Sequence, residues 1–177
     1  MYVVWPLLTA LLISLTGCAT HLPHGVQPVT GFDVARYLGR WHEIARLEHR
    51  FERGLTQVTA DYQRRDDGGI RVINRGFDAE QQRWQSAEGR AYFVQTPDIG
   101  HLKVSFFGPF YSSYVILALD QRNYQYALVT GPDRDYLWLL ARQPQLADAI
   151  KRELVDKARS LGYPVEQLLW LDTPPAL

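Results

Sequence analysis

The sequence predicts an all-β domain: an eight-stranded, up-and-down antiparallel β-barrel with one C-terminal α-helix packed outside it. Short apolar runs alternate with turn residues at intervals of about ten residues, a spacing typical of a barrel or a sandwich. The 7 Phe, 10 Tyr and 5 Trp suit pleated surfaces better than helices. Only one stretch, beyond residue 143, spaces its apolar residues as a helix does.

The expected strands are separated by turns rich in Gly, Pro and Asp. The clearest turn is Asp66-Asp67-Gly68-Gly69, because Asp and Gly tolerate the positive φ of a tight hairpin. The eight strands are expected at residues 41–47, 55–64, 70–77, 84–94, 102–107, 114–119, 124–129 and 136–142.

The predicted helix begins with Pro144, since a first helical residue needs no backbone N–H, and it ends before Gly162. Its apolar stripe consists of Leu146, Ile150, Leu154, Ala158 and Leu161. The strands at 124–129 and 136–141 are apolar on both faces. We therefore expect one face of these strands to look into the barrel and the other to be covered by the helix.

The N-terminal region has the features of an export signal. The uncharged apolar run from Tyr2 to Thr16 is about 15 residues long, short of the roughly 20 that span a bilayer. It ends in Leu15-Thr16-Gly17 before Cys18, the single cysteine, and this resembles the lipobox of bacterial lipoproteins. The resemblance implies a diacylglycerol on the thiol, and Ala19 in place of Asp implies the outer membrane. The alternative is an ordinary cleavage site beside an unmodified thiol.

We accordingly divide the chain into a signal peptide at 1–17, a lipidated tether at 18–31 and a barrel domain at 32–177. Two prolines and two glycines predict an extended tether, which at about 3.3 Å per residue reaches roughly 40 Å and holds the domain clear of the membrane. With 19 basic and 19 acidic residues the net charge is zero, which argues against nucleic-acid binding.

Two motifs at the ends of the predicted barrel resemble the lipocalin family. Gly39-Arg40-Trp41 opens the first strand, and Arg142 closes the eighth strand just before the helix. The family's Thr-Asp-Tyr after the sixth strand is Leu119-Asp120-Gln121 here, so only Asp120 matches. The likeness favours a barrel over a sandwich. The runs at 41–46, 49–54, 104–111 and 131–138 resemble the bacterial outer-membrane lipoprotein lipocalins, and the likeness spans residues 18–170.

Inside such a barrel, Trp41 is expected to plug the closed end as a core residue, with the Arg142 guanidinium on its ring face. An eight-stranded barrel holds either a solid core or one small ligand. Glu43 has the same strand parity as Trp41, so its carboxyl needs a buried partner or a raised pKa. Strand alternation turns the residues of the predicted cavity wall inward: Val58, Ala60, Val72, Ala91, Phe93, Val104, Phe106, Tyr114, Ile116, Tyr136 and Trp138.

The open end is expected at the loops 48–54, 77–82, 107–113 and 131–135. These loops would bring Arg50, Arg53 and Arg134 to the mouth beside aromatic side chains. Cations next to aromatics suit a lipid with an anionic head and an acyl tail. A solvated charged rim is the alternative.

The chemistry-bearing residues favour binding over catalysis. His42-Glu43 and Glu48-His49 lack the His-Glu-x-x-His spacing of a zinc site, and no Gly-x-Ser-x-Gly elbow occurs. We therefore predict no catalytic residue, metal or cofactor. The resemblance implies storage or transport of lysophospholipids or fatty acids for envelope maintenance under stress, at the outer membrane with the barrel facing the periplasm. A lipid-modifying enzyme and a structural lipoprotein with a filled barrel stay open as alternatives, and the sequence does not decide whether the chain forms a homodimer.

Overall fold

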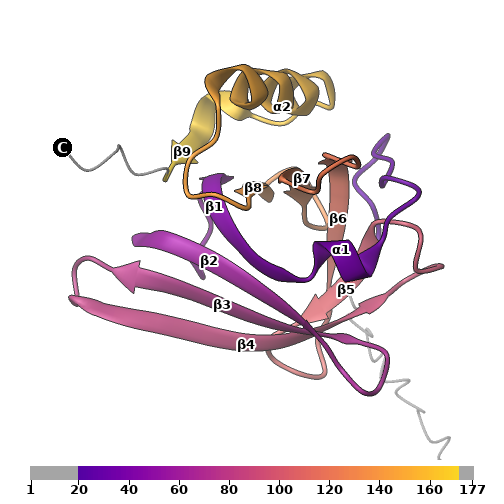
Figure 1. Cartoon of the computed structure of the whole chain (residues 1–177). Helices are drawn as coiled ribbons and strands as arrows, with labels where there is room; N and C mark the ends of the chain where they lie inside the picture. The colour runs from indigo at the N-terminus through magenta and orange to yellow at the C-terminus, as the bar shows by residue number, and fades with distance from the viewer. Residues whose placement is uncertain (1–19, 172–177) are drawn as a thin grey trace, which may run out of the picture.

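The computed structural model describes residues 20–171, so the predicted signal peptide and Cys18 lie outside the described residues. One antiparallel sheet, ordered β2-β3-β4-β5-β6-β7-β8-β1-β9, is closed by an additional pairing between β1 and β2 (Figure 1). Strands β1 to β8 thus form the predicted up-and-down barrel, which is confirmed. Within the described part of the chain, no helix has the length and hydropathy needed to cross a bilayer.

Each expected strand has a counterpart whose ends differ by at most a few residues. The barrel strands are β1 (Gly39–Leu47), β2 (Leu55–Arg64), β3 (Ile70–Asp78), β4 (Arg83–Phe93), β5 (His101–Ser105), β6 (Ser112–Leu119), β7 (Tyr126–Thr130) and β8 (Leu137–Ala141). Three short elements were not expected: helix α1 (Val34–Tyr37), the 3-10 helix η1 (Val165–Gln167) and strand β9 (Leu168–Trp170).

The long helix α2 (Asp148–Ser160) begins later than predicted. Pro144 is not its first residue, because Ala147 still has extended backbone angles of φ −59° and ψ 137°. Asp148 begins the helix instead, where a negative side chain complements the partial positive charge of a helix N-terminus.

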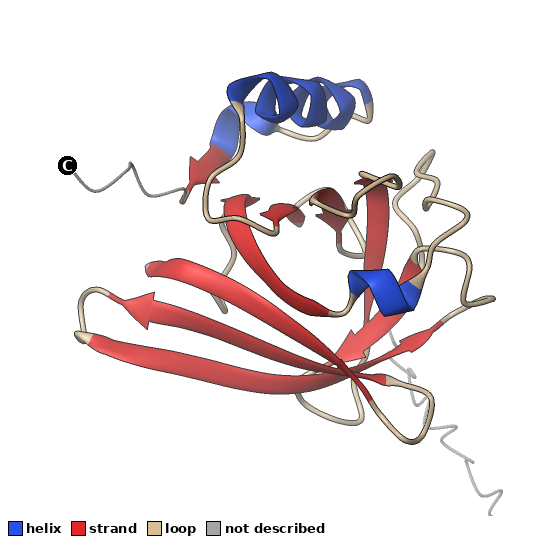
Figure 2. Ribbon diagram, viewed as in Figure 1, coloured by secondary structure: helices blue, strands red, loops and turns tan. Residues whose placement is uncertain are grey.

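The helix covers the outside of the barrel as expected (Figure 2). Leu154 and Ala158 are buried in a cluster with Ala45, Leu128 and Leu139. A second cluster, which includes Trp41, Ile116 and Ala127, fills the closed end inside the barrel. The two faces of β7 and β8 therefore serve two separate cores, which explains why both faces are apolar.

Residues 20–31 do not extend away from the barrel, which corrects the predicted tether. Val26 is buried against the outer core, and the Val29 backbone bonds to Ile116 and Gly100. Figure 1 shows this segment in indigo beside β6. Apolar side chains in the segment pack on the outer wall, so the predicted reach of about 40 Å does not apply to these residues.

Strand β1 has two partners along one of its edges. Its first half, Gly39–His42, pairs with β2, and its end, Ala45–Leu47, pairs with β9. The Leu171 backbone N–H also donates to the Ile44 carbonyl at 2.8 Å. Strand β9 thus pairs with the part of this edge of β1 that does not pair with β2.

Candidate functional site

The barrel encloses a cavity of about 490 Å³ that opens between the loops at one end. This size is typical of a site for a small molecule. The predicted wall residues that line it are Val58, Ala60, Val72, Ala91, Val104, Phe106, Tyr114, Tyr136 and Trp138. The barrel is therefore hollow towards its open end, which differs from the filled barrel expected of a purely structural lipoprotein.

Phe93 and Ile116 do not line the cavity. Phe93 packs near Phe32, at a ring-centroid distance of 6.2 Å, where the chain crosses the closed end. Ile116 is fully buried in the inner core below the cavity. Strand alternation placed both side chains on the correct face, but the core at the closed end occupies more of the barrel than expected.

The motif residues build the closed end. The Arg142 guanidinium lies 4.0 Å from the centre of the Trp41 ring, and Trp41 itself is fully buried. Trp41 Nε1 donates to the Tyr37 carbonyl at 2.8 Å. The Asp120 carboxylate accepts from two backbone N–H groups of its own turn. Gly39 has a φ of +92°, which a residue with a side chain rarely adopts.

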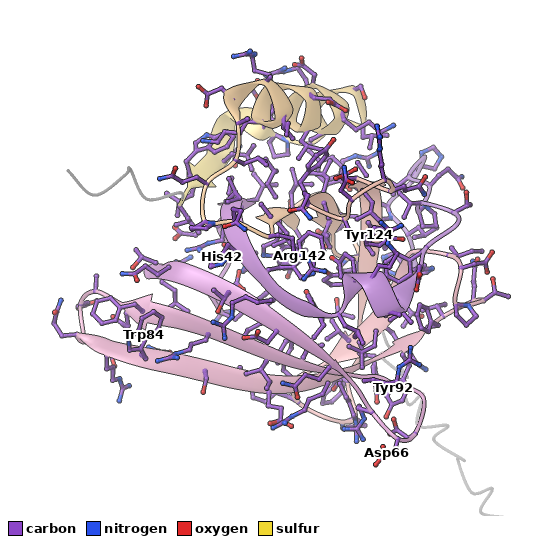
Figure 3. All side chains as sticks on the ribbon, viewed as in Figure 1. His42, Asp66, Trp84, Tyr92, Tyr124 and Arg142 are labelled. Atoms are coloured by element: carbon purple, nitrogen blue, oxygen red, sulfur yellow. The ribbon has the colours of Figure 1, made fainter. Side chains whose placement is uncertain are left out.

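Arg142 also ties three segments together. Its guanidinium donates to the carbonyls of Arg36 at 2.7 Å, Arg40 at 2.8 Å and Tyr124 at 3.2 Å. Figure 3 shows Tyr124 and Arg142 next to each other beside α1. Arg142 therefore holds the closed end together through three hydrogen bonds to backbone carbonyls, in addition to its stacking on Trp41.

A chain of three tyrosine hydroxyls borders the bottom of the cavity. The Tyr114 hydroxyl lies 2.7 Å from that of Tyr37 and 2.8 Å from that of Tyr62. Burial raises the pKa of all three phenols above the ordinary value, so they stay protonated. Three protons serve two bonds within the chain, which leaves one O–H able to donate to a ligand or a water.

A buried charged cluster lies on the wall near the mouth. Arg46, which is fully buried, donates to Glu43 Oε1 at 2.9 Å and to the Glu52 carbonyl at 2.8 Å. Trp138 Nε1 donates to Glu52 Oε2 at 3.0 Å, and His49 Nε2 lies 3.3 Å from the same oxygen. Both carboxyls line the cavity. Glu43 thus has the buried partner that its inward position requires.

Burial dominates the titration of this cluster. It raises the pKa of Glu43 well above its ordinary value, and the nearby Glu52 carboxylate adds to that effect. Burial also raises the pKa of Glu52. The pKa of His49 falls to about 4, because burial and the Arg46 charge both disfavour the imidazolium. His49 is therefore neutral at pH 7, and its ring stacks on Phe51 at 4.0 Å.

The predicted wall residues include neither Arg46 nor Glu52. Glu52 lies in the loop between β1 and β2, where strand alternation makes no prediction, and Arg46 was missed because of an irregularity within β1. A register shift in β1 between Glu43 and Ala45 reverses the alternation that begins at Trp41. Ala45 consequently joins the outer core, and Arg46 turns towards Glu43. A bulge of this kind leaves no clear mark in a single sequence.

The three predicted mouth arginines have different positions. Arg50 and Arg53 are exposed on the loop before β2, but neither lines the cavity. Arg134 lies on the outer surface, where it donates to the carbonyls of Leu161 and His24 at 2.7 Å each. The prediction for Arg134 is wrong, because the C-terminal end of α2 and the N-terminal segment draw its guanidinium away from the mouth. In residues 20–171 no cluster of three or more metal-ligating side chains occurs.

Comparisons with known proteins agree with this architecture. A model of the lipocalin-like domain matches residues 32–173. The outer membrane lipoprotein Blc of Citrobacter freundii is 54% identical over 154 residues, which cover 87% of this chain and 86% of that protein. Apolipoprotein D of Bos taurus is 34% identical over 179 residues, covering 94% and 92% of the two chains. Insecticyanin of the tobacco hornworm Manduca sexta has the same fold, with a TM-score of 0.67, 20% identity and 88% of each chain covered.

Proposed function

The chain belongs to the lipocalin family, and from that premise we propose that it carries a lipid in its barrel as a membrane-anchored lipoprotein. The observation that carries the proposal is the cavity of about 490 Å³, open at one end and walled mainly by apolar side chains. Burial of an acyl chain there would supply most of the affinity, at about 0.8 kcal/mol per CH₂.

The anchor we propose is the acylated Cys18 thiol in the bacterial outer membrane, with the barrel in the periplasm. Support comes from the lipobox-like sequence and from the relatives named outer membrane lipoprotein. The variant Cys18→Ser is expected to leave a precursor or a soluble periplasmic form. Fractionation of this variant with the outer membrane would contradict the anchor.

The ligand class that fits is a lysophospholipid or a fatty acid, held for envelope maintenance under stress. The acyl tail would lie along Val72, Val104 and Phe106. The head would reach the mouth, where Arg50 and Arg53 can meet a phosphate outside the cavity. Contacts at such a wet rim orient a ligand but are weakened by salt.

A titration with lipids of increasing acyl length tests this proposal. Affinity is expected to rise with length and then level off when the cavity is full. The double variant Arg50→Ala/Arg53→Ala should weaken binding of phosphate-bearing lipids more than of neutral lipids with the same tail. The control Arg64→Ala/Arg122→Ala removes two exposed cations at the closed end and should change neither. Affinity independent of acyl length would contradict binding in the cavity.

Binding without chemical change is favoured over catalysis. The two carboxyl groups that line the cavity have partners: Glu43 accepts from Arg46, and Glu52 accepts from the Trp138 indole N–H. Mass spectrometry after long incubation is expected to recover the bound lipid unchanged. A product that accumulates with time would favour the alternative, a lipid-modifying enzyme.

A further inference from the structure

The floor of the cavity is polar, although the walls above it are mainly apolar. Tyr37, Tyr62 and Tyr114 line the cavity, and their hydroxyls are joined in a row with that of Tyr114 in the middle. We call these three residues the tyrosine chain. They come from α1, β2 and β6, which are remote from one another in the sequence. Polar groups placed in a mainly apolar cavity fix the orientation of a ligand and give specificity.

Aromatic packing fixes the position of the tyrosine chain. The Tyr37 ring centre lies 4.7 Å from that of Trp41 and 5.2 Å from that of Phe32, and Tyr37 is buried. The Tyr62 ring centre lies 5.4 Å from that of Tyr37 and 6.1 Å from that of Tyr114. The three hydroxyls are therefore held in place by the core of the closed end before any ligand enters.

The tyrosine chain has one more proton than it has hydrogen bonds. Each hydroxyl keeps its proton, because burial raises the pKa of all three phenols. Within residues 20–171 the three oxygens form hydrogen bonds only with one another, and there are two such bonds. Whichever hydroxyls donate, one O–H has no acceptor and at least one oxygen accepts nothing. A buried donor without an acceptor destabilises the site that contains it.

The group that best fits this floor is a neutral hydroxyl. A carboxylate would lack a counter-ion there, because Glu43 and Glu52 line the same cavity. Arg75 is the one cation among the described residues of the wall, and its guanidinium lies 4.3 Å from the ring centre of the exposed Trp84. A hydroxyl can accept from the free O–H and donate to the free oxygen of the tyrosine chain.

We propose that the tyrosine chain is a subsite for a hydroxyl group at the far end of a lipid's acyl chain. The proposal rests on the proposed lipid binding, in which the head stays at the mouth and the end of the tail reaches the floor. Tyr37, Tyr62 and Tyr114 then determine specificity, because a plain hydrocarbon end leaves their free O–H without an acceptor, whereas a hydroxylated end supplies one.

Two isomeric hydroxy fatty acids test the subsite, both of the acyl length at which affinity levels off. One carries its hydroxyl on the last carbon and the other on the third carbon from the head, so the two differ only in where the hydroxyl lies. Affinity is measured for the wild type and for the variant Tyr37→Phe/Tyr62→Phe/Tyr114→Phe, in which no orphaned hydroxyl remains. The control Tyr163→Phe removes a buried hydroxyl outside the barrel, which donates to Thr130 Oγ1 at 2.8 Å.

The wild type and Tyr163→Phe are expected to bind the chain-end isomer about ten-fold more tightly than the other isomer. The triple variant should lose or reverse this preference, because the hydroxyl would then lie among phenyl rings without a partner. Equal affinity of the wild type for the two isomers overturns the subsite, whether or not the triple variant folds, and leaves lipid binding intact. A preference that persists in the folded triple variant also overturns it. Failure of the wild type to bind either isomer contradicts lipid binding itself.

Discussion

The stacking of Arg142 on Trp41 offers a quantitative test of how burial sets the strength of a cation–π contact. Trp41→Ala is expected to reduce the free energy of unfolding by about 3–5 kcal/mol, as for other buried aromatic truncations. Arg142→Ala removes the same contact and three hydrogen bonds to backbone carbonyls, so we expect a loss of about 2–4 kcal/mol. The energy that the two residues share should be about 2 kcal/mol, since Trp41 excludes water from the stacked face.

The chain contains its own control in the pair Arg75 and Trp84. The guanidinium lies 4.3 Å from the ring centre, nearly the same geometry, but Trp84 is exposed. Here the coupling energy should be about 0.5–1 kcal/mol. Both double-mutant cycles can be measured by urea unfolding followed by far-ultraviolet circular dichroism, because fluorescence changes when a Trp is removed. Equal coupling in the two cycles, or additivity at Trp41 and Arg142 within about 0.5 kcal/mol, would refute the reasoning.

Three further predictions concern buried polar groups. Arg46→Ala should lower the free energy of unfolding by about 3–5 kcal/mol, measured in urea, because it leaves Glu43 buried without its partner. The control Arg40→Ala, in the exposed pair with Asp61, should lower it by less than about 1 kcal/mol, and similar losses in the two variants would contradict the prediction. The pKa of His49 is about 4 in the folded chain and 6.5 for an ordinary histidine, so the unfolded chain binds more protons than the folded chain between these two pH values. The free energy of unfolding of the wild type, relative to that of His49→Gln, should therefore fall by about 2–3 kcal/mol as the pH drops from 7 to 4. A difference that is constant with pH would show that His49 titrates normally. Tyr114→Phe should cost about 1–3 kcal/mol because it leaves the hydroxyls of Tyr37 and Tyr62 without their partner, and the surface change Tyr92→Phe should cost clearly less in the same assay.

The strands were predictable because the alternation of their side chains follows directly from burial on one face. Turn residues such as those at 66–69 then marked where each strand ends. The closed end was predictable for a similar reason, since Trp41 and Arg142 belong to motifs at the first and last strands of the barrel. The same alternation placed nine of the eleven expected wall residues on the cavity.

The charged cluster and the N-terminal segment were not predictable, because each depends on contacts between distant parts of the chain. The bulge after Glu43 turns the Arg46 side chain inward, because one extra residue in β1 moves every later side chain of the strand to the opposite face of the sheet. Arg134 was expected at the mouth from its loop alone. Its hydrogen-bond partners are the backbone carbonyls of His24 and Leu161, which are remote in sequence, so a single sequence does not predict that they lie beside Arg134.

The pairing of β9 with the end of β1 has a consequence for how the chain behaves when its C-terminal region is lost. A truncation after Ser160 would remove β9 and the Leu171 contact, and the backbone groups of Ala45–Leu47 would then lack their partners along that edge. Unpaired strand edges recruit strands of other molecules, which leads to domain swapping and aggregation. Size-exclusion chromatography of the truncated chain should reveal oligomers or aggregates, and the short C-terminal strand would then count among the features that keep this barrel soluble.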